Sequence, residues 1–388
     1  MAVVKTTGAR IAGITTCVPT RRFDNVKDSS AFTPEEIRKV TGMAGVSSRH
    51  IAGETICSSD LCIAAAQRLL DRLRWHPGSI DAVIMVTQTP DYFLPSTACV
   101  IHHRLNLADH CAAFDVGLGC SGYPYGMWLA AMMLQGGGMR RVLVLHGETP
   151  TRFSDQSDRS VSLLFGDAGS ATALESTGLT EPTWHYALHS DGGGYNSMII
   201  ESGGFRNRFE QDRHKHSVSM NGALIFNFTI KRVPALIDET LKAASVGTDD
   251  IDYFILHQSN QFIMKHLCVK QSLPAEKVPI ILRHFGNTGG ASIPLAMTQG
   301  HLMRPRDRSL RLMLLGYGVG LSWGSALVDL DSNAILDSLE LDNTSQVLAL
   351  MTVQPGSSRV KQSLFLVLHP ALDEPSQSNW LNKERDWS

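Results

Sequence analysis

The sequence has no apolar run long enough to cross a membrane, which takes about 18 to 20 consecutive apolar residues. Its first residues, MAVVKTTGARIAGITTCVP, contain no long apolar segment followed by a small-residue cleavage site, so we expect no secretory signal. An excess of one charge is also lacking, because 35 Lys and Arg stand against 37 Asp and Glu, a net charge of −2. This balance argues against a basic surface for nucleic acid or for an anionic membrane.

Regular cysteine spacing is absent as well. The seven cysteines are an odd number without a C-x-x-C pair, which argues against a disulfide framework and favours a reducing cytoplasm. The sequence also lacks an H-E-x-x-H zinc motif and a phosphate-binding P-loop. Except for Cys120, we interpret the cysteines as small buried hydrophobes: Cys17, Cys57, Cys62, Cys99, Cys111 and Cys268.

The composition is that of an ordinary folded protein, with 43% hydrophobic and 19% charged residues among 388. This length suggests two domains, or one large domain of two halves. Apolar runs of strand length alternate with amphipathic segments, which predicts an α/β protein with helices on both faces of its sheets. Strands are predicted over 10–18, 80–87, 112–116, 142–146, 251–256, 310–315 and 323–329, and helices over 33–42, 61–73, 95–105, 224–241 and 262–270.

The runs DAVIMV at 81–86 and DYFILHQ at 252–258 occupy comparable places, which suggests an internal duplication. From Asp331 onward the composition changes. Two β-like runs, 347–353 and 364–369, are separated by turn residues and favour a hairpin.

The stretch CAAFDVGLGCSGYPYGMWLAAMMLQ places Cys120 on a sharp turn between a buried strand and a helix. The free N–H groups and the dipole of the first helical turn favour negative charge, so we expect this thiol to ionise more easily than usual. The glycines on both sides allow a tight turn and leave the sulfur uncrowded. Cys120 is therefore the candidate nucleophile.

Two more polar residues follow at strand and helix junctions. His257 ends the buried run IDYFIL, and Asn287 lies in a glycine-rich turn before a helix. Each alone has an ordinary explanation, as a hydrogen-bonded core histidine or a turn asparagine. Together with Cys120 they form a set in which a thiolate attacks an acyl group, while His and Asn stabilise an oxyanion or enolate.

The motifs GCSG at 119–122, HQSN at 257–260 and GNTGGASIPLA at 286–296 resemble the catalytic motifs of β-ketoacyl-ACP synthase III. Four further stretches match that family in order: TGMAGVSSRHIA, LPSTA, DRSVSLLFGDAGSATAL and GYGVGLSWGSALV. The resemblance covers roughly residues 8–330.

That resemblance implies a thiolase-like α/β fold, in which two similar halves are stacked in five α-β-α-β-α layers and the chain pairs as a homodimer. Residues 1–178 would form the half with the nucleophilic cysteine, and 179–330 the half with the histidine and asparagine. Residues 331–388 would be a C-terminal extension of unknown role.

The implied reaction has two stages. Cys120 takes an acyl group from acyl-CoA or an acyl carrier protein; malonyl-carrier then loses CO2, and its carbanion attacks the acyl-enzyme. His257 and Asn287 would stabilise the enolate, and the backbone N–H groups of Cys120 and Val319 would form the oxyanion hole. No metal or redox cofactor is needed, and CoA or phosphopantetheine thioesters are the substrates.

Four other residues carry over by the same resemblance. Asn260 would contact the pantetheine arm, and Arg159 would lie against the CoA nucleotide. Gly222 would line the pantetheine tunnel, and Leu94 would cross the dimer interface to cap the acyl pocket. A purely structural role is the alternative for each of them.

Two positions depart from the family. Its fatty-acid initiators have a tryptophan that stacks on the CoA adenine, where this chain has Ile37 or Lys39. Phe262 stands where an arginine helps to dock the carrier, and an apolar ring cannot replace that charge. These changes favour a primer carried on ACP, or a specialised acyl group, over acetyl-CoA.

Two other functions stay open. An acyltransferase on the same fold would pass the acyl group to an oxygen or nitrogen nucleophile in a secondary-metabolite or glycan pathway, and would not need the enolate site of His257 and Asn287. A non-catalytic partner subunit would only shape a heterodimer, and the intact Cys/His/Asn set argues against it.

Overall fold

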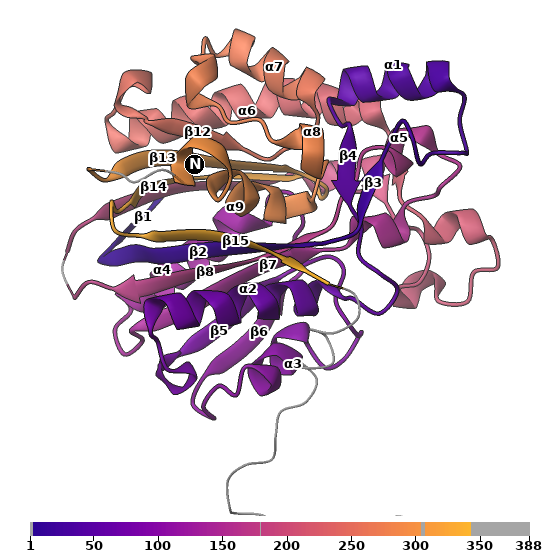
Figure 1. The fold of residues 1–388 in the computed structure, drawn as a ribbon. Helices are drawn as coiled ribbons and strands as arrows, with labels where there is room; N and C mark the ends of the chain where they lie inside the picture. Colours follow the sequence, from indigo (N-terminus) through magenta and orange to yellow (C-terminus); the bar gives the residue numbers. More distant parts are fainter. Residues whose placement is uncertain (1–2, 179, 304–306, 343–388) are drawn as a thin grey trace, which may run out of the picture. The chain divides into compact units, whose positions relative to one another are not determined.

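The computed structural model describes residues 3–178, 180–303 and 307–342. Contacts divide the chain into Met1–Thr352 and Val353–Ser388, and all described residues belong to the first unit. The predicted hairpin runs at 347–353 and 364–369 lie outside the described residues. Two mixed sheets alternate with helices in this first unit, which confirms the predicted five-layer α/β fold of two similar halves (Figure 1).

A six-stranded sheet comes mainly from the first half of the chain. Its strands are β2 (Ala9–Pro19), β5 (Ala82–Val86), β6 (Ala112–Val116), β7 (Arg141–Glu148), β8 (Ala168–Ser176) and β15 (Ile335–Leu341). They lie in the order β15-β2-β8-β7-β5-β6, with β5 parallel to both of its neighbours. Every residue of β5 is buried, as its near-continuous apolar run predicts.

A five-stranded sheet comes mainly from the second half. Its strands are β1 (Val3–Thr7), β9 (Thr183–Ser190), β12 (Tyr253–Leu256), β13 (Leu310–Gly318) and β14 (Ser322–Leu330), in the order β1-β9-β14-β13-β12. Four neighbouring strands of this sheet, β9-β14-β13-β12, repeat the arrangement of β2-β8-β7-β5 in the other sheet. In each set the first two neighbouring pairs are antiparallel and the third pair is parallel. This common order agrees with the internal duplication inferred from the two apolar runs.

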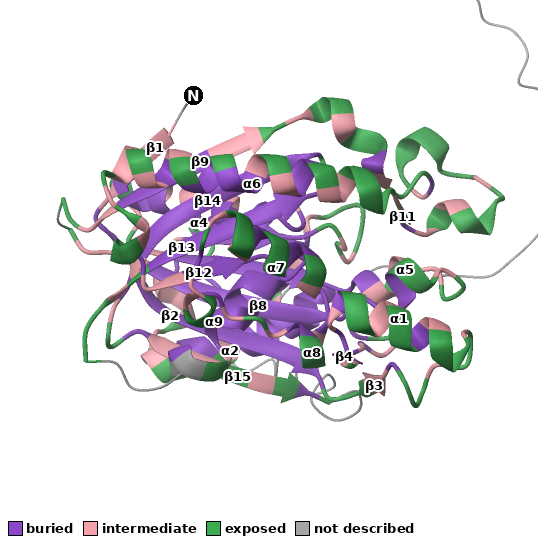
Figure 2. Cartoon of the chain, turned by 90° about the horizontal axis from the view of Figure 1, so that it is seen from above, coloured by how far each residue is buried: buried purple, intermediate pink, exposed green. Residues whose placement is uncertain are grey.

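Helices cover the outer face of each sheet. Helices α2 (Ser58–Leu73) and α3 (Thr97–Arg104) share an apolar cluster with the six-stranded sheet, and α6 (Gly222–Ala244) and α7 (Gln261–Lys270) share one with the five-stranded sheet. Helices α4 (Gly122–Gln135) and α9 (Ser292–Met297) lie between the two sheets in a third cluster. Helix α4 contains no charged residue, and most of it is buried (Figure 2), as expected for a helix that lies between two sheets.

Shorter elements gather beside the layers. They are β3 (Arg22–Asp24), α1 (Pro34–Ala44), β4 (Ser48–His50), α5 (Arg159–Ser162), β10 (Met198–Ile199), β11 (Ser219–Met220) and α8 (Leu282–Phe285). Helix α1 begins where the sequence predicts it, because Thr33 and Glu36 form a capping box and Pro34 opens the first turn.

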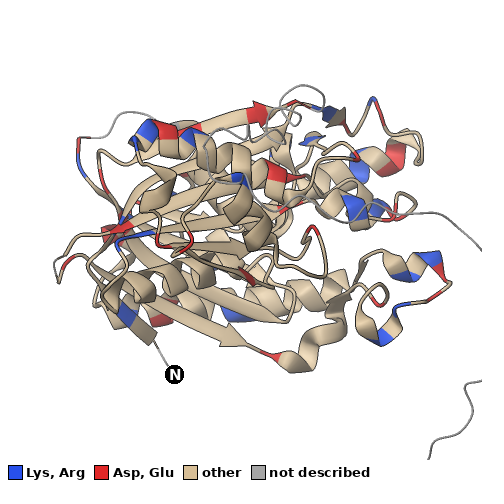
Figure 3. Cartoon of the chain, turned by 90° about the horizontal axis from the view of Figure 1, so that it is seen from below, with Lys and Arg blue, Asp and Glu red and all other residues tan. Residues whose placement is uncertain are grey.

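Charged residues of both signs lie mainly on helices and loops, and the ribbons of the sheets are mostly uncharged (Figure 3). None of the helices within 3–178, 180–303 and 307–342 has the length and apolar character that a membrane crossing requires.

Two strands pair with the sheet of the opposite half of the chain. β1, from the start of the chain, pairs with β9 in the second sheet, and β15 pairs in parallel with β2 in the first sheet. Residues 335–341 of the predicted C-terminal extension are therefore an edge strand of the first half. The boundaries near 178 and 330 stay a prediction for the remainder of the two halves.

Removing residues 331–388 should destabilise the protein, because β15 would be lost from the sheet edge. Leu341 is fully buried, and withdrawing one such side chain from the core costs about 1.5–3 kcal/mol. A chain that ends at Asp342 keeps the whole strand and is the matched control. Urea unfolding of the two truncated proteins measures the difference, and equal stabilities would show that β15 does not contribute.

Candidate active site

Cys120 lies where the first sheet meets the central helices. β6 ends at Val116, and the turn that follows leads directly into α4, with Ser121 as the N-cap residue. The Oγ atoms of Ser121 and Ser322 lie 2.6 Å apart and connect this turn to β14 of the other sheet. The strand–turn–helix placement predicted for Cys120 is confirmed.

The end of β13 approaches Cys120 from the other sheet. A Cβ built on Gly318 would lie 2.7 Å from Cβ of Cys120 and 3.1 Å from its Sγ, so only glycine fits there. The nearby backbone N–H groups of Cys120 and Val319 favour the thiolate form of the sulfur and lower its pKa. These are the two N–H groups expected to form the oxyanion hole.

Burial nevertheless determines the charge of the thiol. Cys120 is 8% exposed, and burial, followed by the nearby Glu148 carboxylate, raises the pKa of Cys120 from an ordinary value of 9.0 to about 12. The two N–H groups act in the opposite direction but do not offset these effects. The expectation of an easily ionised thiol is therefore wrong. The free-energy cost of removing a thiolate from water exceeds the stabilisation that the helix terminus and the turn give to its charge.

His257 directly follows β12 and is 2% exposed. Its Nδ1 lies 2.8 Å from Oγ of Ser292 in α9, and the same oxygen accepts the N–H of Gln258 at 3.1 Å. The Ser292 hydroxyl hydrogen is then available to Nδ1, and on this ground we assign the ring hydrogen to Nε2. Burial lowers the pKa of His257 to about 3, so the imidazole is neutral at pH 7.

Tyr317 links the histidine to the cysteine. Its ring stands edge-on to that of His257 with the centroids 5.4 Å apart, and its hydroxyl donates to the backbone oxygen of His257 at 3.1 Å. The next residue, Gly318, packs against Cys120. Two residues of one strand thus bring Cys120 and His257 to the same place.

Asn287 is fixed by its backbone and by its side chain. Its N–H donates to the oxygen of Leu164 at 2.9 Å, and its own carbonyl accepts the N–H of Gly166 at 3.1 Å. Nδ2 donates to the oxygen of Ser259 at 3.3 Å, and Oδ1 accepts the N–H of Gly289 at 3.0 Å. Because Nδ2 carries two hydrogens, one remains for a ligand.

The sequence did not predict a buried pair beneath the site, His146 and Glu148 at the end of β7. Their Nε2 and Oε1 atoms lie 3.8 Å apart, and both residues are almost completely buried. A Cβ on Gly290 would overlap the His146 ring, and one on Gly289 would lie 2.8 Å from Cγ of Glu148. The glycine turn that carries Asn287 therefore rests on this pair. The available sequence signal was two polar residues ending the apolar run VLVLHGE.

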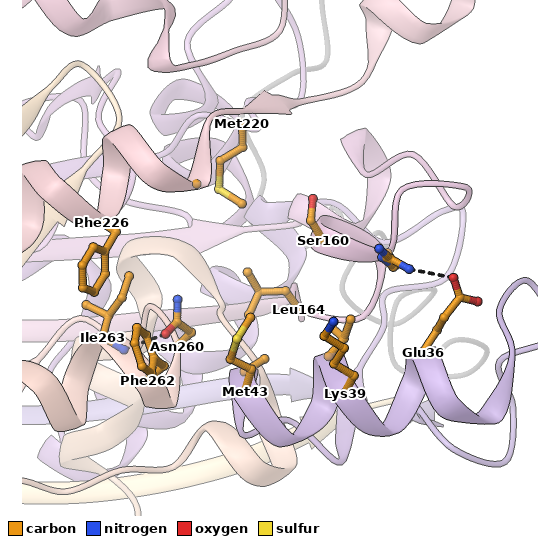
Figure 4. A pocket seen from close by; sticks show the side chains of 14 residues that line it. Glu36, Lys39, Met43, Ser160, Leu164, Met220, Phe226, Asn260, Phe262 and Ile263 are labelled. Carbon is orange, nitrogen blue, oxygen red and sulfur yellow. Dashed lines mark hydrogen bonds and ion pairs between the residues drawn. The ribbon is translucent and has the colours of Figure 1, made fainter.

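A pocket of about 420 Å³ lies beside the site, between α1, α5, α6 and α7 (Figure 4). Three of the four residues expected to bind substrate line it: Arg159, Gly222 and Asn260. Oδ1 of Asn260 accepts the N–H of Ile263 at 2.8 Å, which holds the amide at the pocket wall. A Cβ on Gly222 would meet no atom within 4 Å, as expected for a residue facing open space.

The pocket also clarifies the two departures from the family. Lys39 lines it, whereas Ile37 is buried and does not, so Lys39 is the one of the two that faces the pocket. Phe262 lines it too, stacked on Phe226 with the ring centroids 5.5 Å apart.

The fourth expected residue, Leu94, is 78% exposed and does not line this pocket. It follows Tyr92 and Phe93, which are exposed as well, and Phe93 contacts the ring of Phe205. The expectation that the other six cysteines are buried is confirmed for Cys17, Cys62 and Cys111. It is wrong for Cys99, which is exposed, and for Cys57 and Cys268, which are only half-buried.

Known proteins were compared with the chain. The sequence family described as 3-oxoacyl-[acyl-carrier-protein (ACP)] synthase III matches residues 114–192, and the family of its C terminal matches residues 241–330. A putative 3-oxoacyl-[acyl-carrier-protein] synthase 3 of Campylobacter jejuni is 33% identical over 339 residues, which cover 83% of this chain and 94% of that protein. The β-ketoacyl-[acyl-carrier-protein] synthase III of Acaryochloris marina is 32% identical over 330 residues, with coverages of 83% and 97%.

Among solved structures, a 3-oxoacyl-(acyl-carrier protein) synthase from Burkholderia xenovorans LB400 superposes with a TM-score of 0.84 at 41% identity. The match covers 88% of this chain and 99% of that one.

The rate at which iodoacetamide alkylates the buried Cys120 should keep rising with pH and should not level off near neutral pH. Since the pKa of Cys120 is about 12, its thiolate fraction rises about tenfold per pH unit through the alkaline range. Glu148→Gln should speed alkylation at a fixed pH, because the charge of Glu148 raises that pKa. Peptide mapping by mass spectrometry gives the rate at Cys120 alone.

Glu276→Gln is the control, because it removes the same charge from an exposed site. A rate that levels off near pH 7, or equal rates in the two variants, would contradict this description of the thiol.

Proposed function

The chain belongs to the 3-oxoacyl-ACP synthase III family, and from this premise we propose that Cys120, His257 and Asn287 catalyse a decarboxylative condensation. The proposal rests mainly on one observation: the buried Cys120, packed against Gly318 at the end of β13, shares a site with a neutral histidine and an asparagine held by hydrogen bonds. The enzyme is on this basis an acyltransferase that makes 3-oxoacyl thioesters.

In the first stage, Sγ of Cys120 attacks the carbonyl carbon of an acyl thioester. The N–H groups of Cys120 and Val319 receive the developing oxyanion, which is the place where fixed donors help most. The C–S bond to pantetheine then breaks, and the departing thiolate takes the proton that Cys120 loses. Because Cys120 starts as a neutral thiol, proton loss and attack have to be coupled.

In the second stage, a malonyl thioester places its carbonyl oxygen between Nε2 of His257 and Nδ2 of Asn287. Loss of CO2 leaves the C–C bonding pair as an enolate, and both donors stabilise its oxygen. The enolate carbon attacks the acyl-Cys120 carbonyl, a C–C bond forms, and the C–S bond to Cys120 breaks. The sulfur leaves as thiolate and is protonated by solvent water. A neutral histidine suits this role, since it donates a hydrogen bond without giving up its proton.

The pocket of Figure 4 is the proposed route for the pantetheine arm of the thioester, with Asn260 and Gly222 along the route and Arg159 at its mouth. Acyl carrier protein and acyl-CoA are the proposed partners. We further propose a homodimer in which Leu94, exposed on one subunit, caps the acyl pocket of the other. A cytoplasmic location is the expectation that follows from the unpatterned cysteines.

Transfer of the acyl group to an oxygen or nitrogen nucleophile is the competing function. It would use Cys120 and the oxyanion hole, but it forms no enolate that His257 and Asn287 could stabilise. The hydrogen bonds that hold both side chains at the site favour condensation over simple transfer. A non-catalytic subunit is disfavoured on the same ground.

Cys120→Ala should fold but take up no acyl group. Wild-type protein exposed to acyl-CoA and acyl-carrier donors should gain the mass of one acyl group, located on the Cys120 peptide. Cys99→Ala is the control for surface acylation, since Cys99 is the exposed cysteine. Acylation of the Cys120→Ala protein would refute the nucleophile assignment.

His257→Ala should still acylate at Cys120 but lose CO2 release from malonyl-carrier by roughly 10² to 10³-fold, the usual cost of one oxyanion donor. Ser292→Ala should cause a smaller loss, because the ring stays but its tautomer is no longer supported. In wild type, CO2 release should show no inflection near pH 6.5, since a histidine with a pKa of about 3 does not titrate there. Radiolabelled CO2 release measures all three; an inflection at pH 6.5 would contradict the neutral histidine.

A further inference from the structure

An ion pair crosses the mouth of the pocket (Figure 4). Nη1 of Arg159 in α5 lies 2.6 Å from Oε1 of Glu36 in α1, and both residues line the pocket. The two helices are far apart in sequence and contact each other at this place. Arg159, the residue expected to meet the CoA nucleotide, is thus already engaged by a carboxylate of its own chain.

The capping box of α1 holds that carboxylate in position. Oε2 of Glu36 accepts the N–H of Thr33 at 3.0 Å and its hydroxyl at 2.9 Å, while Oε1 accepts Arg159. The Thr33 N–H and hydroxyl, together with Arg159, lower the pKa of Glu36, so it is ionised at neutral pH. Both oxygens of Glu36 are therefore used, and its charge stays at the mouth.

Few charged residues line the pocket. Three charged residues line it, Glu36, Lys39 and Arg159, which gives a net charge of +2 − 1 = +1. The nucleotide end of CoA carries a 3′-phosphate and a pyrophosphate, about four negative charges at neutral pH. Phosphopantetheine on a carrier protein brings one phosphodiester charge. The mouth therefore suits the carrier-borne arm better than the CoA nucleotide.

Apart from Ser160 and Asn260, the uncharged residues that line the pocket offer no polar side chain. Met43 is 60% exposed and Phe262 is 53% exposed, and Phe262 stacks on Phe226. These side chains can receive the methyl groups of a pantetheine arm but offer no hydrogen bonds to phosphates.

We propose that the Glu36–Arg159 ion pair makes this enzyme select acyl groups borne on a carrier protein over acyl groups borne on CoA. The proposal rests on the function proposed above and names the donor class for the first stage. Glu36 is the specificity-determining residue, because it neutralises the arginine and repels nucleotide phosphates.

The test measures how fast Cys120 is acylated, by intact mass, from the same acyl chains loaded on CoA and on acyl carrier protein. Wild type should acylate faster from the carrier. Glu36→Gln should raise the ratio of the CoA rate to the carrier rate by about two- to fivefold, the range expected when one exposed ion pair is removed. Glutamine keeps an oxygen for the Thr33 cap, so the helix start is preserved.

Two matched variants complete the design. Glu35→Gln removes the same charge from the adjacent exposed residue, leaves the Glu36–Arg159 pair intact, and should not change the ratio. The double variant Glu36→Gln/Arg159→Ala should lose the gain, because the released arginine is what binds the nucleotide.

Equal changes in Glu35→Gln and Glu36→Gln, or a wild-type preference for CoA donors, would overturn the proposed selectivity while leaving the condensing function in place. Failure of every donor of both classes to acylate Cys120 would overturn the proposed function, and this selectivity with it.

Discussion

Helix α4 carries no charged residue, and all of its residues except Met132 and Gln135 near its C-terminal end are buried or half-buried. Such an apolar helix is stable only where protein covers it. The two sheets provide that cover, and the rest of the architecture follows from it. With α4 between the sheets, its N-terminal turn lies at the ends of β6, β12 and β13, where both halves of the chain can reach it. Strand ends on two sheets are the natural place to assemble side chains from distant parts of a sequence.

The same burial sets the charge of the site. Exclusion of water raises the pKa of Cys120 and lowers that of His257, so that both groups are neutral at pH 7. A neutral site avoids the large cost of burying an isolated ion. Charge develops only when a thioester arrives, and the donors that receive it are already in place on backbone and side-chain hydrogen bonds. The buried side chain of Glu148 packs against the glycine turn at Gly289 and accepts the N–H of Gln88 at 3.0 Å.

The sequence predicted the parts of this structure whose signal is local. Apolar runs located β5, β12 and β13, and Pro34 with the acidic residues of the first turn located the start of α1. The motifs located Cys120, His257 and Asn287, because their junction positions are visible in the chain. β8 was not predicted, since its residues AGSATALES are too small and polar to give an apolar run, although they are buried in the sheet.

Pairing between distant segments left no local signal. Nothing in Ile335–Leu341 shows that it would join β2 more than 300 residues earlier. The thiol pKa was misjudged for a related reason, since burial depends on packing from the whole fold, whereas the helix terminus is visible in the sequence. The Glu36–Arg159 and His146–Glu148 pairs likewise depend on tertiary contact.

The centre of the site is therefore held by buried hydrogen bonds, whereas its mouth is held by an exposed ion pair. At the centre, buried hydrogen bonds fix Asn287 and His257, and water and salt have little access to them. At the mouth, Glu36 and Arg159 form their pair on the surface, where screening by salt weakens it. Changes at the mouth cost little stability, because exposed pairs contribute little to folding. The condensing chemistry can thus stay constant while substitutions at a few exposed positions alter which thioester is admitted.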